Sequence, residues 1–377
     1  MPTAHSRIAG SANNRMPRTK ARTSAPSQTP FDLGYWMPAE WEHHHATWLG
    51  WPHEQTDWPG KFPTIPWAFA EIVRHLTRVE RVYLLVQNRA AESQVRAILK
   101  KSGANLAAVD FFRVPTDRGW MRDSGPISIS NSSGDVAYTH WRFNGWAKYA
   151  NHKKDAVAAA LVNKKLKHRV WQPMHKGRRV VLEGGSIDVN GRGSLLTTEE
   201  CLLSTTQERN PGFTRDDYAQ VFRDYLGATQ ILWLRHGIAG DDTHGHVDDL
   251  ARFVNPTTIV TVVERDPSDA NYGALQENLA LLQKMKDHDG RAFRVETLPM
   301  PAPVYFEGQR LPASYANFYI ANKLVIVPTF NDANDRVALN TLAGLFPDRE
   351  VVGIACRDLV LGLGTLHCMT QQQPSHR

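Results

Sequence analysis

The sequence has few cysteines and no long apolar run. Its three cysteines, Cys201, Cys356 and Cys368, cannot build a disulfide framework, and no two of them have Cys-x-x-Cys spacing. This pattern favours a reducing compartment and predicts a cytoplasmic location. No apolar stretch is long enough to cross a bilayer, so membrane association is not expected. A chain of 377 residues with 42% apolar content can still bury a substantial core.

Acidic residues are absent from residues 1–31. This segment carries five basic residues and is rich in Ser, Thr, Pro and Asn, which predicts a disordered basic tail. Its composition also fits an organelle transit peptide or a dispensable extension. Without those five charges the formal net charge of +6 falls to about +1, so nucleic-acid binding is not expected. No Pro- or Ser-rich linker divides the rest, which predicts one catalytic domain over residues 32–377.

Helical and strand patterns alternate along this body, which predicts an α/β fold. Asn190-Gly191, between two short apolar segments, predicts a hairpin turn. Helices are expected at Trp67–Val79, Ala90–Lys101, Asp155–Lys164, Asp216–Leu226, Ser268–His288 and Asp332–Phe346. Strands are expected at Arg81–Val86, Phe111–Val114, Ile127–Ser130, Val180–Glu183, Gln230–Leu234, Thr258–Val263 and Lys323–Val327.

One cysteine, Cys368, lies at a position where a substrate could reach its sulfur. Cys368 follows a Gly-x-Gly turn formed by Gly362 and Gly364, and glycines there allow a substrate to approach the sulfur without a Cβ in the way. A buried, unreactive cysteine is the alternative interpretation. Groups elsewhere in the chain are needed to decide between them.

Two upstream regions supply such groups. If residues 241–249 are extended, His244, His246 and Asp248 alternate onto one face and place a base beside a carboxylate. Asp123 lies at a loop-to-strand junction and Glu183 at a Gly-Gly turn. Each residue also has a structural alternative, as a turn cap, a solvated strand end or a surface histidine. Taken together, they provide acids, a base and a thiol.

Several carboxylates around one thiol suit a cationic electrophile. Negative charge raises the pKa of a cysteine and repels the oxyanion that forms on a neutral amide. A guanidinium is planar and permanently charged, and carboxylates hold its N–H groups in pairs, with about 1.5–3 kcal/mol per charge-assisted bond. Its charge also stabilises a neighbouring thiolate. The residues therefore predict chemistry on a guanidinium carbon.

Longer motifs show what the chain resembles. They run in order from about Tyr35 to Pro374 and comprise Met37-Pro38-Ala39-Glu40-Trp41-Glu42, Ala46-Thr47-Trp48-Leu49-Gly50-Trp51-Pro52, Trp120-Met121-Arg122-Asp123-Ser124-Gly125-Pro126, Glu183-Gly184-Gly185-Ser186-Ile187, Leu195-Leu196-Thr197-Thr198-Glu199-Glu200-Cys201-Leu202-Leu203, Gly245-His246-Val247-Asp248 and Leu366-His367-Cys368-Met369-Thr370-Gln371-Gln372-Gln373-Pro374. With these motifs the chain resembles the agmatine deiminases, or agmatine iminohydrolases. That family belongs with the Porphyromonas-type peptidylarginine deiminases in the pentein, or guanidine-modifying, superfamily.

The resemblance implies a fold and a role for each site residue. The fold is a five-fold pseudosymmetric α/β propeller. Cys368 stands at the family nucleophile, His246 at the general acid/base, Asp123 and Asp248 at the carboxylates that hold the guanidinium, and Glu183 at the acid that orients the histidine. The implied reaction converts agmatine to N-carbamoylputrescine and ammonia, a step of putrescine and polyamine biosynthesis, through a cysteine thiouronium intermediate. It needs no cofactor and no metal, and family members are often homodimers or homotetramers.

The far end of the substrate is less well defined. Trp120 and Trp51 suit a methylene chain and a cation. Many agmatine deiminases have Asn-Asp-x-Trp where this chain has Asp117-Arg118-Gly119-Trp120, and an all-Gly or Gly-Gly-Gly-Asn turn where it has Gly362-Leu363-Gly364-Thr365. Because Arg118 places a cation near the pocket mouth, free arginine and peptidyl-arginine stay open as alternative substrates.

Two other classes of function are also open. His244-x-His246-x-Asp248 has a spacing seen in metal sites, with Asp123 or Glu183 able to complete the shell, which would make the chain a metal-dependent hydrolase. Against this hypothesis, the cysteine at the Gly turn would have no role. A guanidinium-binding protein without catalysis is the other alternative, and the competent residue at every expected catalytic position argues against it.

Overall fold

The computed structural model describes residues 28–375, and these form an α/β fold. The central strands are runs of Val, Ile, Leu and Thr, and β14 is buried along its whole length, as expected for a strand covered on both faces. The strands are β1 (Tyr35–Trp36), β2 (His44–Gly50), β3 (Arg81–Val86), β4 (Val109–Arg113), β5 (Ile127–Asn131), β6 (Val136–Thr139), β7 (Arg169–Trp171), β8 (Met174–His175), β9 (Arg178–Arg179), β10 (Asp188–Val189), β11 (Ser194–Thr198), β12 (Gln230–Leu234), β13 (Ala251–Asn255), β14 (Thr258–Val263), β15 (Arg294–Pro299), β16 (Tyr305–Phe306), β17 (Gln309–Arg310), β18 (Tyr319–Ala321), β19 (Leu324–Thr329), β20 (Glu350–Ala355) and β21 (Thr370–Pro374).

The larger sheets of the described residues share one connection pattern. In each, a strand pairs antiparallel with one neighbour and parallel with the strand that follows a helical connection, as β14 does with β13 and β15. Parallel neighbours need such a crossover because a tight turn can only reverse the chain. These sheets have the strand orders β1-β5-β6-β7, β10-β11-β12, β13-β14-β15, β18-β19-β20 and β21-β2-β3-β4.

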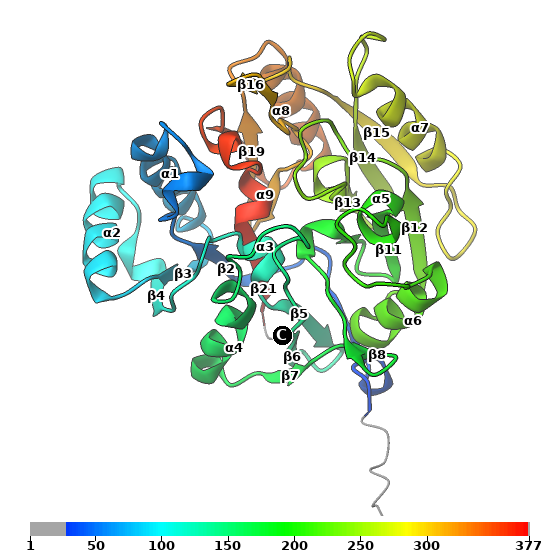
Figure 1. The fold of residues 1–377 in the computed structure, drawn as a ribbon, viewed down its shortest axis with the longest axis horizontal. Helices are drawn as coiled ribbons and strands as arrows, with labels where there is room; N and C mark the ends of the chain where they lie inside the picture. Colours follow the sequence, from blue (N-terminus) through cyan, green and yellow to red (C-terminus); the bar gives the residue numbers. More distant parts are fainter. Residues whose placement is uncertain (1–27, 376–377) are drawn as a thin grey trace, which may run out of the picture.

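The longer helices lie at the periphery, and the sheets lie between them and the centre (Figure 1). Helix α2 illustrates the local signals, because Asn88 accepts a hydrogen bond from the Ala91 N–H at its start and Gly103, with φ 78°, ends it. The helices are α1 (Ile65–Leu76), α2 (Arg89–Ser102), α3 (Met121–Ser124), α4 (Asp155–Leu166), α5 (Glu199–Leu203), α6 (Arg215–Leu226), α7 (Tyr272–Leu282), α8 (Asn334–Leu345) and α9 (Leu366–Met369). No helix in residues 28–375 has the length and apolar character needed to cross a membrane.

The two ends of the described chain meet in one sheet. Strand β21 pairs antiparallel with β2, so that Gln371 lies opposite Trp48. The short helices α3 and α9 pack against each other in the middle of the molecule (Figure 1). As a result, segments from the first third and the end of the sequence lie side by side at the centre.

Most of the elements expected from the sequence are confirmed, with shifted ends. The expected strand Val180–Glu183 is wrong, since Val181 makes only an isolated bridge with Arg142. Helix α7 is shorter than the expected Ser268–His288, because turns flank both of its ends. The hairpin is confirmed, although its loop spans residues 190–193 and is held by the side chain of Asn190.

The expected basic tail falls largely outside the described residues. The described part of it, residues 28–31, contacts the body: the Gln28 carbonyl accepts a hydrogen bond of 3.1 Å from Trp171 Nε1, and the Pro30 carbonyl accepts one from the Tyr35 N–H. The sequence pattern assigns these four residues to the tail, and the domain boundary at residue 32 stays a prediction.

Candidate active site

The cavity that contains the predicted nucleophile has a volume of about 450 Å³. Its floor is formed by Asp123 and Cys368, which lie on the central helices α3 and α9. The cavity is lined by Thr56, Asp57, Pro59, Arg118, Trp120, Asp123, Trp146, Tyr149, Asp242, Thr243, Phe306, Glu307, Gln309, Leu361, Gly362, Leu363 and Cys368.

The thiol of Cys368 is only 6% exposed and is surrounded by polar groups. Asn317 Nδ2 donates a hydrogen bond of 3.0 Å to the sulfur, and Asp248 Oδ2 lies 3.7 Å from it. Burial, together with the charges of Asp248, Asp249 and Asp123, raises the pKa of the thiol well above its usual value. The sulfur therefore gains from any positive charge brought next to it.

Two glycines allow the reactive groups to approach one another. A Cβ on Gly364 would lie 3.0 Å from the Cβ of Cys368 and 3.0 Å from a ring carbon of Trp120. A Cβ on Gly185 would lie 2.6 Å from His246 Nδ1 and 3.0 Å from carboxylate oxygens of both Asp123 and Asp248. Larger residues at either position would push the site apart.

The two carboxylates predicted to bind the guanidinium are Asp123 on α3 and Asp248 on the short 3-10 helix η6 (Val247–Asp249). Asp123 accepts hydrogen bonds from Trp146 Nε1 at 2.8 Å and from the Gly185 N–H at 2.9 Å, and burial raises its pKa. Asp248 is fully buried, but its Oδ1 has no hydrogen-bond partner among the described residues. Buried acceptors of this kind are rare, and this one is available to a donor that enters the site.

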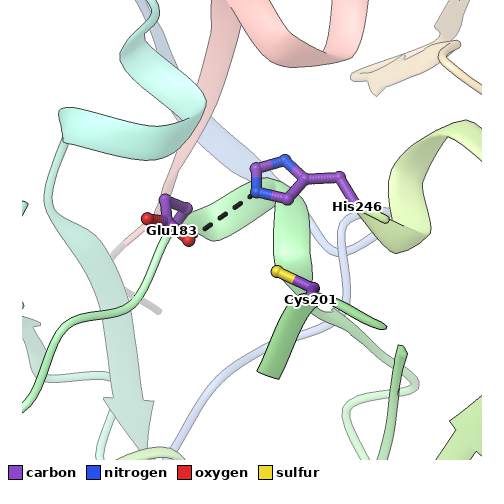
Figure 2. A group of neighbouring side chains, drawn as sticks. All are labelled: Glu183, Cys201 and His246. Atoms are coloured by element: carbon purple, nitrogen blue, oxygen red, sulfur yellow. Dashed lines mark ion pairs between the residues drawn. The ribbon is translucent and has the colours of Figure 1, made fainter. Parts of the chain in front are cut away.

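His246 lies between two carboxylates. Its Nε2 is 3.7 Å from Glu183 Oε2, an ion pair drawn as a dashed line in Figure 2, and its Nδ1 is 3.9 Å from Asp123 Oδ1. Neither ring nitrogen has a hydrogen-bond partner among the described residues. Burial opposes protonation, but the charge of Asp123 and the adjacent Cys201 and Glu183 side chains raise the pKa of His246 well above its usual value.

Glu183 is the acid on the other side of that ring. It is fully buried and accepts from Arg209 Nε at 3.2 Å through both oxygens. Burial alone would raise its pKa, yet the Arg209 guanidinium and His246 hold it below its usual range. Glu183 is thus fixed as a carboxylate that faces the histidine.

The condition under which His244, His246 and Asp248 would share one face, an extended segment over residues 241–249, is not met. The segment turns, with φ 64° at His244 and 91° at Gly245, and the Asp241 carboxylate accepts from the N–H groups of Gly245 and His246. His244 is directed to Ser204 Oγ, 3.1 Å from its Nε2, rather than to the site. The trio His244, His246 and Asp248 therefore does not form a metal cluster among residues 28–375.

A second histidine of the site was missed from the sequence. His367 lies next to the nucleophile, is 1% exposed, and makes hydrogen bonds through both ring nitrogens: Nδ1 to Asp248 Oδ2 at 2.7 Å and Nε2 to Glu40 Oε2 at 2.8 Å. Although burial acts against it, the Arg252, His367 and Arg122 charges hold the pKa of Glu40 well below its usual range. Both residues stood in the quoted motifs, but nothing in the sequence connected them.

Asn317 was also missed. Its Nδ2 donates to Cys368, and its Oδ1 accepts from Thr365 Oγ1 at 2.7 Å and from the His367 N–H at 3.0 Å. Thr365 thus supports the loop of the nucleophile through its hydrogen bond to Asn317. An amide far along the chain carries no sequence signal for such a role.

At the mouth, Arg118 is neutralised by the protein itself. Its guanidinium forms an ion pair with Asp57 and lies 4.3 Å from the centre of the Tyr149 ring. Burial raises the pKa of Asp57 to about 6, against the attraction of Arg118. The indole Nε1 of Trp120 also donates to Asp57, at 3.3 Å.

Two further acids, Asp242 and Glu307, line the cavity. Asp242 forms an ion pair with Lys148 and accepts from the Tyr149 hydroxyl at 2.6 Å. Glu307, at the turn between β16 and β17, is exposed and has no ion-pair partner among the described residues. Trp51, by contrast, does not line the cavity but packs in the core, with its ring 6.2 Å from that of Phe69. Its predicted contact with the substrate is therefore not retained.

The fold and this cavity define an α/β protein in which a thiol and a carboxylate line a polar pocket, with an imidazole and further carboxylates directly next to them. The chain belongs to the Porphyromonas-type peptidyl-arginine deiminase family, whose model matches residues 36–374. It is 34% identical over 372 residues to the agmatine deiminase of Stutzerimonas stutzeri, covering 93% of this chain and 98% of the relative.

Solved structures show the same likeness. The agmatine deiminase of Enterococcus faecalis superposes with a TM-score of 0.84 at 30% identity, covering 94% of this chain and 99% of that one. A substrate-bound variant of the agmatine deiminase of C. jejuni gives a TM-score of 0.80 at 31% identity, covering 91% and 97%. The family resemblance inferred from the motifs is thus confirmed.

Proposed function

We propose that this chain hydrolyses the guanidinium group of agmatine to N-carbamoylputrescine and ammonia. The observation that carries the proposal is the convergence of Cys368, His246, Asp123 and Asp248 around Gly185 and the cavity floor. The similarity to agmatine deiminases over nearly the whole chain supports the substrate.

The carboxylates hold the substrate in the first step. Asp123 and Asp248 each accept N–H groups of the guanidinium, and the unbonded Asp248 Oδ1 offers an acceptor for one of them. The substrate's positive charge offsets the carboxylates that raise the pKa of Cys368. Bound substrate therefore favours the thiolate at the moment when the thiolate is needed.

Covalent chemistry follows. The Cys368 thiolate attacks the guanidinium carbon, His246 donates a proton from its ring to the departing nitrogen, and ammonia leaves a thiouronium on the sulfur. Neutral His246 then takes a proton from water, which adds to the same carbon and releases Cys368 and the ureido product. Glu183, fixed by Arg209, keeps the ring oriented and favours its protonated form in the first step.

The mouth favours a second cation over a carboxylate. Because Asp57 neutralises Arg118, this guanidinium is not free to bind the carboxylate of arginine. Asp242 is likewise paired with Lys148, which leaves Glu307 as the acid of the cavity lining without an ion-pair partner among the described residues. This charge supports agmatine over free arginine or peptidyl-arginine.

The decisive test is a parallel assay of ammonia and ureido-product release on agmatine, free arginine and a blocked arginine peptide. We expect agmatine to give the highest kcat/KM by a wide margin. Comparable or better activity on either of the others would reject the agmatine assignment and keep the deiminase chemistry. No ammonia release from any of the three would reject the proposed reaction itself.

We also propose that the larger sheets are related by five-fold pseudosymmetry. Five sheets share the antiparallel-then-parallel strand pairing, which supports repeated units around the centre occupied by α3 and α9. The homodimer or homotetramer that the resemblance implies and the cytoplasmic location that the cysteine pattern predicts stay predictions. Light scattering and cell fractionation check them.

A further inference from the structure

The mechanism leaves one buried thiol beside the catalytic histidine without a role. Cys201 lies on α5, is 1% exposed, and donates its N–H to the Thr198 side chain that caps that helix. Figure 2 shows its sulfur, the Glu183 carboxylate and the His246 ring directed toward one another from three separate segments. Their ligand atoms all lie within 4.8 Å of one another.

We infer that Cys201, His246 and Glu183 form a binding site for a thiophilic divalent cation such as Zn²⁺, and that occupation of this site inhibits the enzyme. Thiolate, imidazole and carboxylate are the ligands that zinc prefers, and three of them with water in the fourth position is a common zinc arrangement. The inhibitory part rests on the proposed function, because it assumes that His246 carries protons in the reaction.

The spacing is close to that of a tetrahedral ion. With metal–ligand distances of about 2.0 Å to nitrogen and oxygen and 2.3 Å to sulfur, a nitrogen–oxygen pair lies about 3.3 Å apart and a pair that includes the sulfur about 3.5 Å apart. His246 Nε2 and Glu183 Oε2 are 3.7 Å apart, so they would move closer by about 0.4 Å to share an ion. His246 is 1% exposed, and neither ring nitrogen has a hydrogen-bond partner among the described residues, so a cation would satisfy a buried polar atom that the protein leaves unbonded.

Binding would change the histidine in a defined way. Cys201 would bind as a thiolate and His246 through a neutral ring nitrogen, and their protons would pass to solvent. Glu183 would exchange its contact with the ring for a bond to the ion and keep its hydrogen bonds to Arg209. With Nε2 on the metal, His246 could no longer become the imidazolium that protonates the leaving amine.

A second cluster of possible metal ligands among the described residues must be distinguished from this one. Asp248, Asp249 and Cys368 also place ligand atoms within 4.8 Å of one another. That second cluster offers no histidine, and Cys368 and Asp249 already share the Asn317 amide. Since each candidate contains one cysteine, and Cys356 is a third buried thiol in the hydrophobic core, the cysteines separate the alternatives.

The test uses Co²⁺ as a spectroscopic substitute for Zn²⁺ on the purified full-length protein. A cobalt–thiolate bond gives a near-ultraviolet charge-transfer band, which requires no enzyme activity. The double variant Cys356→Ala/Cys368→Ala leaves Cys201 as the only cysteine, and we expect it to keep the band with one ion bound per chain. Cys201→Ala should lose the band, and Cys356→Ala is the matched control that should keep it.

Inhibition is measured separately, with each variant compared with its own rate after EDTA treatment. The Zn²⁺ concentration for half-inhibition should rise at least about tenfold in Cys201→Ala and stay unchanged in Cys356→Ala. Loss of the cobalt band in the double variant, or its loss in Cys368→Ala with retention in Cys201→Ala, would overturn the assigned site. A band from Cys201 without zinc inhibition would overturn only the regulatory part. Absence of agmatine turnover would count against the proposed function and leave the cobalt result to decide the site.

Discussion

The charged groups around the floor of the cavity and those at its mouth differ in whether the protein already provides each of them with a partner. Next to the floor residues Asp123 and Cys368, the His246 ring and one oxygen of Asp248 are buried without hydrogen-bond partners among the described residues. At the mouth, Arg118 is paired with Asp57 and Asp242 with Lys148. The floor therefore presents unbonded groups to a substrate, whereas the mouth presents charges that are mostly neutralised already.

This difference suggests that the floor determines the reaction rate and the mouth determines which substrate is preferred. A buried polar atom without a partner gains much from the correct ligand, since the alternative is a desolvated group left alone. A charge that already has a partner near solvent gains little. Substitutions at the floor should therefore cost orders of magnitude in rate, and substitutions at the mouth should change substrate preference by small factors.

The largest effect is expected at the nucleophile. Cys368→Ala should lower kcat for agmatine by about 10⁴-fold or more, because covalent catalysis is lost while the carboxylates still bind the guanidinium. Ureido-product formation and equilibrium dialysis with labelled agmatine measure the two quantities. Cys356→Ala, which removes a buried thiol away from the cavity, is the control. Turnover retained in Cys368→Ala would show that this sulfur does not form the intermediate.

The next largest effect is expected at the carboxylates that bind the guanidinium. Asp248 and its neighbour Asp249 give a matched pair of variants, of which only Asp248 is assigned to substrate binding. Asp248→Asn, like Asp123→Asn, should lower kcat/KM by about 10²- to 10³-fold, because an amide supplies fewer acceptors to a guanidinium. Burial and the charge of Asp248 raise the pKa of Asp249 well above its usual value, and its Oδ1 already accepts a hydrogen bond of 3.0 Å from Asn317 Nδ2, so Asp249→Asn should change kcat/KM only a few-fold. Equal losses of kcat/KM in Asp248→Asn and Asp249→Asn would contradict the assignment of Asp248 as a carboxylate that binds the guanidinium.

The raised pKa of Cys368 predicts how its reactivity depends on pH. Because the thiol is protonated at neutral pH, its alkylation by neutral iodoacetamide should speed up about tenfold per pH unit from about pH 7 to 9. A haloacetamidine carries its own positive charge, so it should label Cys368 quickly already at neutral pH, ahead of Cys201 and Cys356. Mass spectrometry of labelled peptides measures both rates. A flat iodoacetamide profile would show that the free thiol is already ionised.

A smaller effect is expected at His367, which touches Asp248 rather than the substrate. Its loss removes a hydrogen bond to a charged group, worth about 1.5–3 kcal/mol, so His367→Ala should lower kcat by about 10- to 100-fold. His367→Gln can still donate to one carboxylate and should recover part of that loss. If the residue only supports folding, the melting temperature would fall and the kcat of the folded fraction would stay normal.

The smallest effects belong to the mouth. Glu307→Gln should raise KM for agmatine by up to about fivefold, as expected for an exposed charge. Arg118→Ala, tested alone and with Asp57→Asn to avoid an unpaired buried acid, should alter the agmatine-to-arginine ratio of kcat/KM by less than about fivefold. A loss of arginine activity alone in Arg118→Ala would show that this guanidinium does bind a carboxylate.

The sequence predicted the floor better than the mouth, for a physical reason. Cys368, His246 and Asp123 lie next to glycine turns, where a local pattern marks a strained or crowded backbone. The pairing of Arg118 with Asp57 joins two loops far apart in the chain, which no local pattern encodes.

The errors have the same origin. His244 was placed beside His246 because an alternating pattern assumes an extended strand, and the Asp241 carboxylate instead folds that segment into turns. Trp51 was assigned to the substrate for its ring alone, yet burial against Phe69 accounts for it. Asn317 and Glu40 reach the site through tertiary contacts, so they had no local signal.

The pairing of β21 with β2 has a consequence for biosynthesis. A ribosome makes β2 early and β21 late, so a growing chain holds β2 with one edge unpaired until the last strand of that sheet arrives. An unpaired strand edge can pair with the wrong strand, so we expect chaperones to bind the nascent chain at this stage. Cys368 lies two residues before β21. Its thiol therefore reaches Asp123 and Asp248 only when β21 pairs with β2, and we expect an incomplete chain to have no assembled active site.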